Sequence, residues 1–263
     1  MVKLTRGSFV VMKTTIIALA VCAVCIASTS AQIIPPKRIG FVAGGTANFN
    51  KPSIAVWRTS DSLSGALQPF HNLDANIRFS NSGSGIGGAF GLAGGIPLSH
   101  TIHLAGSVGY SSMPTSITTE QRIPTATATH NLSLFTSVLQ IAPQVEFYNL
   151  FSGLSLHPFA GIDVGIPLMT TESRYSTINQ QNTNSDQTIS NDAPVADAST
   201  RVALLLGLGY TFTVDSNVYI QPHITYSHPL TNVSSNAAFS PTSIAQVRLG
   251  VSVFLGLSDA AGL

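Results

Sequence analysis

Apolar and non-apolar side chains alternate along eight segments of this chain. In residues 201–213, for example, Val202 and Leu204 share one parity, and arginine, alanine, glycine and threonine take most of the other. A period of two is the pattern of a β-strand whose two faces meet different surroundings. The segments that we predict as strands are residues 38–49, 85–96, 102–111, 132–148, 156–168, 201–213, 218–227 and 244–257.

The segment 132–148 is less regular than the others. Its apolar positions change parity between Leu134 and Leu139. One extra residue in a strand shifts the parity of everything that follows it, so we expect a β-bulge near Phe135 or Thr136.

The lengths of the segments and of their connections favour a membrane barrel. Each segment has ten to seventeen residues, whereas soluble strands average about five or six and a tilted membrane strand needs about nine to eleven. Short connections alternate with long polar ones, which are residues 50–84, 112–131, 169–200 and 228–243. This layout is typical of an all-β, eight-stranded antiparallel up-and-down transmembrane β-barrel, with both termini at the short-turn end.

Composition and charge agree with this fold class and exclude others. Only 9% of the 263 residues are charged, against roughly 25% in soluble domains. The 12 lysines and arginines barely exceed the 11 acidic residues, so no basic surplus is present to bind nucleic acid.

Alternation alone also fits a soluble lipocalin-like barrel, whose apolar face lines the lumen. Here the other face is rich in glycine, alanine and serine, whereas the surface of a soluble barrel would carry lysine and glutamate. Eight strands enclose a narrow lumen that small side chains suit. We therefore predict that the apolar face meets lipid and the glycine-rich face lines the lumen.

The first 31 residues have the organisation of a secretory signal peptide. Three basic residues precede a twelve-residue apolar run, 16–27, and small residues end at Ala31. The run is too short to cross a bilayer core of about 30 Å, so we expect cleavage after Ala31 and not a membrane helix.

Cleavage would leave a barrel over residues 32–257 and a short C-terminal tail, 258–263. Both cysteines, Cys22 and Cys25, would leave with residues 1–31, so we expect no disulfide. Neither cysteine follows a small residue, which argues against a lipoprotein. Met12 is a second candidate for the start of translation.

Few charged or histidine side chains fall within the predicted strands, and they share the lumen parity. They are Glu146, Asp163, Arg201, Arg248, His103, His157 and His223, with Glu146 reaching this face after the expected bulge. A charge in a narrow lumen is too costly unless it is paired. We therefore predict a lumenal charge network in which Glu146 and Asp163 accept hydrogen bonds from Arg201 or Arg248. Its role would be a structural plug, and the alternative is a gated ion path.

The residue patterns indicate no catalytic, cofactor or metal chemistry. A G-x-S-x-G nucleophile elbow is absent. Residues 83–88 match G-x-G-x-x-G, but a glycine-rich strand follows them where a dinucleotide site needs a helix. No cluster of His, Asp and Glu has the spacing of metal ligands. We expect no enzyme activity, no cofactor and no metal.

With these features the chain resembles the OmpA-like, porin-family outer-membrane β-barrel proteins of bacteria. The resemblance covers residues 33–257 and includes residues 157–165, HPFAGIDVG, similar to a Pro-aromatic-x-Gly-x-x-x-Gly strand of such barrels. It implies a monomeric protein that serves as an anchor, an adhesin, a narrow pore or a host-interaction protein. The chain departs from the family in lacking a terminal aromatic residue and a peptidoglycan-binding domain.

We therefore expect an integral outer-membrane protein with a structural or surface-interaction role, in contact with membrane lipid. A surface ligand or host protein would bind the long loops, above all 169–200 and the loop 50–84 with Trp57, Phe70 and Phe79. The alternatives are a narrow pore or transporter for small solutes and a soluble lipid-binding barrel of the periplasm.

Overall fold

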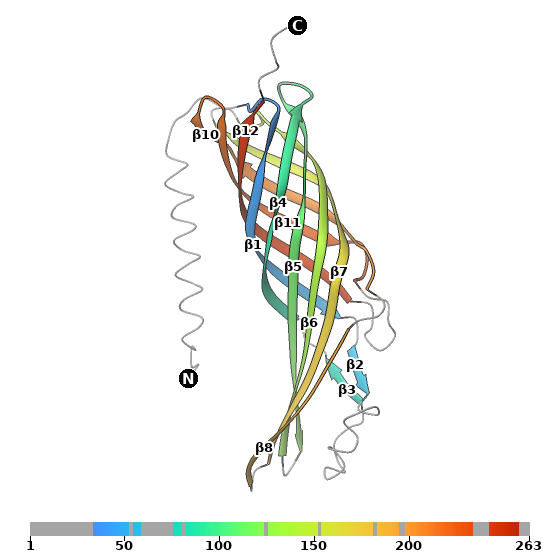
Figure 1. The fold of residues 1–263 in the computed structure, drawn as a ribbon. Helices are drawn as coiled ribbons and strands as arrows, with labels where there is room; N and C mark the ends of the chain where they lie inside the picture. Colours follow the sequence, from blue (N-terminus) through green and yellow to red (C-terminus); the bar gives the residue numbers. More distant parts are fainter. Residues whose placement is uncertain are drawn as a thin grey trace.

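The computed structural model describes residues 34–52, 55–58, 76–79, 83–123, 126–151, 154–180, 183–194, 198–233 and 242–257. The regular structure of these residues is all β (Figure 1). The strands are β1 (Arg38–Pro52), β2 (Ala55–Arg58), β3 (Asn76–Phe79), β4 (Gly83–Pro97), β5 (Ile102–Ile123), β6 (Ala126–Phe147), β7 (Leu156–Gln180), β8 (Thr183–Pro194), β9 (Arg201–Tyr210), β10 (Phe212–Asp215), β11 (Val218–Pro229) and β12 (Thr242–Gly256). The expected signal peptide and C-terminal tail lie outside the described residues.

Eight antiparallel strand positions, hereafter staves, close into a ring, and the position of β9 is continued by β10 beyond Thr211. The order around the ring is β1, β4, β5, β6, β7, β9, β11 and β12. β1 pairs with β12 from Arg38↔Gly256 to Pro52↔Thr242, so the first and last strands of the ring seal the wall. The predicted eight-stranded antiparallel barrel is therefore confirmed, and each predicted segment lies in one stave.

For two of the connections the prediction of a long loop is wrong, because the structure forms paired strands there. β5 continues to Ile123 and β6 begins at Ala126, so these two strands pair almost to their turn. β7 runs on to Gln180 and pairs there with β8. Both stretches are rich in threonine and contain isoleucine, and β-branched residues favour strands. Residues 118–131 and 171–194, hereafter the extended hairpins, project beyond the barrel (Figure 1).

The connection 50–84 contains a smaller hairpin. β2 pairs with β3 from Ala55↔Phe79 to Arg58↔Asn76. Trp57 lies in β2 and Phe79 in β3, whereas Phe70 lies outside the described residues.

The prediction of a β-bulge in residues 132–148 is also wrong. β5 and β6 pair without a shift from Ile102↔Phe147 to Ile123↔Ala126. The irregularity lies on β7, where Leu168 is skipped between the pairs Ser137↔Met169 and Val138↔Pro167. The inner face of β6 keeps one parity throughout: Leu132 and Leu134 are buried on it, and Leu134 packs in an apolar cluster. This cluster, hereafter the apolar plug, consists of Met113, Leu134, Val138, Val233 and Ile244.

The outer wall of the barrel is apolar and its inner wall is small or polar. Phe41, Ile86 and Leu206 are 70%, 74% and 58% exposed, and other large apolar side chains of the staves accompany them on the outside. Arg201, Glu146 and Asp163 are at most 2% exposed and lie inside. This is the inverse of a soluble barrel, and the wall is that of a transmembrane barrel. No helix in the described part of the chain is long and apolar enough to cross a membrane.

Candidate functional site

The inward side chains of β6 pass through the successive layers that fill the lumen. From the short-turn end they are Glu146, Gln144, Ala142, Gln140 and Val138, all on one face because the strand carries no bulge. These five residues take part in four lumenal groups, with Gln144 both bonding Glu146 and lining the cavity. The groups are a first charge cluster, a cavity with an apolar layer, a second charge cluster and the apolar plug.

The first charge cluster is centred on the carboxylate of Glu146. Arg38 Nη2 donates to Glu146 Oε2 in an ion pair whose two side chains are 1% and 3% exposed. Tyr148 Oη donates to the same oxygen at 2.9 Å, and Gln144 Nε2 donates to Oε1 at 3.0 Å. The partner of Glu146 is thus Arg38, where we expected Arg201 or Arg248. Arg38 lies on the lumen parity of the first predicted strand, and this signal could have identified it.

A row of rings fills the lumen beside this pair. The ring of Tyr148 lies 4.4 Å from that of His103 and is stacked 4.5 Å from that of His157, measured between centroids. Phe159 follows, with its centroid 6.4 Å from that of His157. The Gln221 amide contacts His157 Nε2 from β11. These rings come from the neighbouring strands β5 and β7 and from the residue that follows β6, and Gln221 meets them from β11, so they fill part of the lumen near its short-turn end.

The second charge cluster contains Asp163, Arg201 and Arg248. Arg201 Nη1 donates to Asp163 Oδ2 at 2.7 Å, so the structure brings this predicted pair together. Gln140 Nε2 donates to Asp163 Oδ1 at 2.7 Å, and its Oε1 accepts from Arg248 Nη2. Arg248 Nη2 also donates to Gln246 Oε1 at 3.0 Å. The amide of Gln140 therefore links the ion pair to the second arginine, and no pattern in the sequence marked Gln140 or Gln246 as part of the network.

The apolar plug lies directly beside the second cluster, toward the extended hairpins. Arg201 Nε donates to the carbonyl oxygen of Ile244 at 3.1 Å, and Ile244 is a member of the plug. Met113, Val138 and Val233 are 1–2% exposed. Beyond the second cluster the lumen thus contains apolar packing, together with the buried polar side chains of Thr136, Thr170 and Glu172.

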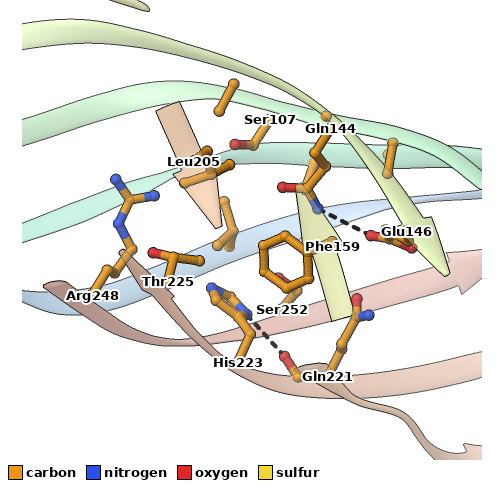
Figure 2. A pocket seen from close by; sticks show the side chains of 16 residues that line it. Ser107, Gln144, Glu146, Phe159, Leu205, Gln221, His223, Thr225, Arg248 and Ser252 are labelled. Carbon is orange, nitrogen blue, oxygen red and sulfur yellow. Dashed lines mark hydrogen bonds between the residues drawn. The ribbon is translucent and has the colours of Figure 1, made fainter. Parts of the chain in front are cut away.

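A cavity of about 40 Å³ lies between the two charge clusters. Figure 2 shows Arg248 at one end of it and Glu146 at the other, with the ring of Phe159 between them. His223 lines the cavity from β11 and its Nδ1 lies 3.2 Å from the carbonyl oxygen of Gln221. His157 and His223 thus both lie in the lumen. Their hydrogen bonds in this site go to Ser155 and Gln221 and not to Glu146 or Asp163.

Glycines on the neighbouring staves make room for the lumenal rings. A Cβ at Gly207 would lie 2.2 Å from Phe159 Cζ, and one at Gly209 would lie 2.5 Å from His157 Nε2. Each glycine is the cross-strand partner of the residue whose ring covers it. The large side chains fit inside eight strands because their partners have no side chain.

These layers bury the charged side chains of the strands inside the barrel. No group of three His, Cys, Asp or Glu side chains able to hold a metal occurs among the described residues. The chain is an eight-stranded antiparallel transmembrane β-barrel.

Comparison with known proteins finds similar solved structures. No family model and no curated protein matches it. Solved structures similar to it include Ail, the attachment invasion locus protein of Yersinia pestis, in complex with the heparin analogue sucrose octasulfate (10% identity, 84% of this chain and 99% of that chain, TM-score 0.30). Others are the neisserial surface protein NspA (14%, 84% and 99%, TM-score 0.34) and the outer membrane protein OprG from Pseudomonas aeruginosa (10%, 87% and 100%, TM-score 0.34).

Proposed function

We propose that the protein is a non-enzymatic, monomeric integral protein of the bacterial outer membrane, exported by its signal peptide, whose barrel anchors the extended hairpins at the cell surface. The observation that carries this proposal is the combination of a filled lumen with strands that continue far past the wall. β5 has 22 residues and β7 has 25, whereas about nine to eleven cross a membrane.

The filled lumen favours an anchor over a pore or transporter. A conducting path needs a continuous wet channel, and an eight-stranded barrel has an interior that side chains just fill. In this barrel the ring row, the two charge clusters and the apolar plug follow one another along the axis, with a cavity of about 40 Å³ between the charge clusters.

The extended hairpins are the surface that we propose for a ligand or partner protein. They present paired, polar strands rich in serine, threonine and asparagine. Outer-membrane barrels carry their long connections outside and their short turns in the periplasm. On this basis the β7–β8 hairpin lies outside the cell and the β10–β11 turn faces the periplasm.

Planar-bilayer recording tests the anchor against the pore. Purified protein inserted into a bilayer should give no discrete conductance steps. Reproducible steps in the wild type would overturn the anchor proposal and support a narrow pore.

Protease accessibility tests the orientation. A recognition sequence for a site-specific protease is inserted between Gln180 and Thr183, and a matched control carries it in the turn between Asp215 and Val218. On intact cells we expect cleavage of the first variant and protection of the control, which should be cut only after the outer membrane is permeabilised. The reverse pattern would contradict the proposed topology.

A further inference from the structure

Arg248 is a buried cation without an acidic partner. Its residue is 6% exposed, and its hydrogen bonds go to the neutral amide oxygens of Gln140 and Gln246. Its Nε has no hydrogen-bond partner. A buried charge is costly unless an opposite charge or a set of oriented dipoles compensates it.

The carboxylates in the lumen are already engaged elsewhere. Asp163 pairs with Arg201, and Glu146 pairs with Arg38. The two charge clusters therefore hold three guanidinium groups against two carboxylates and carry a net charge of +1, with histidines neutral. Glu172 is also buried, but it lies nine residues beyond Asp163 on β7, roughly 30 Å along the strand at about 3.3 Å per residue.

The cavity that Arg248 lines has the size and the donors for a small ion. A water needs about 10–15 Å³ of such space, so a volume of about 40 Å³ holds one halide-sized ion with one or two waters. The hydroxyls of Ser107, Thr225 and Ser252 line the same cavity and can each donate a hydrogen bond. Glu146 also lines it, at the far end from Arg248 (Figure 2).

We propose that this cavity is a binding site for one monovalent inorganic anion of halide size, which supplies the missing counter-charge of Arg248. Chloride is the anion of this class that we assign to it. The site would add an ion to the filled core, and it does not depend on what the extended hairpins bind. A divalent or organic anion is disfavoured, because the uncompensated charge is single and the space is small.

Bromide diffraction tests the site directly. Crystals of the mature protein in detergent, grown in sodium bromide, should show an anomalous peak in the cavity beside the Arg248 guanidinium. Crystals of R248Q grown in the same way should lack this peak, because glutamine still offers N–H donors but carries no charge. A wild-type cavity that holds only water, or a peak retained in R248Q, would overturn the proposal.

Thermal unfolding provides an independent measurement. At constant ionic strength, replacing gluconate by chloride should raise the Tm of the wild type. Each tenfold increase above the dissociation constant stabilises the folded state by about 1.4 kcal/mol, or about 3–6 °C. The variant K37Q removes an exposed cation outside the lumen and should keep this dependence. Equal Tm values in the two salts would count against the site.

Gln246 offers a variant that supplies the anion from the chain itself. Gln246 Oε1 already accepts from Arg248, so Q246E places a carboxylate beside the guanidinium with little change in shape. We expect Q246E to lose both the chloride dependence and the bromide peak, and to melt above the wild type in gluconate. A wild-type response to chloride in Q246E would refute the charge argument, even if R248Q failed to fold.

Discussion

Replacing Arg201 by methionine should destabilise the barrel strongly, because it leaves the carboxylate of Asp163 buried without its guanidinium. Asp163 is 0% exposed and Arg201 is 1% exposed, so water cannot take the place of the lost partner. Gln140 still donates one hydrogen bond to Asp163. Breaking one side of a buried ion pair costs about 3–5 kcal/mol, and we expect R201M to lose stability of this size.

The double variant R201M/D163N is the matched control. It removes both charges and keeps a polar group opposite Gln140, so it should recover most of the stability that R201M loses. The measurement is guanidinium-induced unfolding of the protein in lipid vesicles, followed by far-ultraviolet circular dichroism. If R201M changed the free energy of unfolding by less than about 1 kcal/mol, or if the double variant were no more stable than R201M, the ion pair would not support the core as we have argued.

Two further predictions concern the walls of the barrel. G207A should lose about 1–3 kcal/mol by overpacking, because its Cβ would lie 2.2 Å from Phe159 Cζ, whereas G45A, with nothing within 4 Å, should unfold like the wild type. Combining G207A with F159L should restore part of the stability, because the backbone oxygen of Ile224 stays 2.9 Å from the added Cβ, and an equal loss in G45A would show that ring packing is not the cause. L206R, on the 58% exposed outer wall, should cost about 2–4 kcal/mol in vesicles. V214R, next to the β10–β11 turn, should cost about 0–1 kcal/mol because it lies near the interface, and the opposite order would contradict the lipid-facing assignment.

The period of two was sufficient to locate the staves because it is a local property. Each inward or outward side chain follows from its parity once one face is known, so Asp163 and Arg201 could be placed in the lumen before the structure was known. The predicted bulge failed for a related reason. The inward leucines of β6 look like misplaced lipid-facing residues in the sequence, and only the packing of Leu134 against Met113 and Ile244 explains them.

The extended hairpins show a second limit of local reasoning. Their polar composition matches both a loop and a strand above the membrane, because outside lipid neither face of a strand must be apolar. The pairing of β5 with β6 from Thr118↔Asn131 outward, and of β7 with β8 from Ser173↔Asp192 outward, shows that both stretches are strands.

By itself the sequence determined the fold class, the number of staves, the lipid-facing parity and the burial of the strand charges. These features depend on period, length and residue type, which are local. The tertiary structure alone decided which charges meet: Arg38 and Glu146 are separated by 108 residues, and Arg248 and Gln140 are too. The register and tilt of the closed wall bring these residues to the same level of the lumen, and both follow from the whole ring and from no single strand.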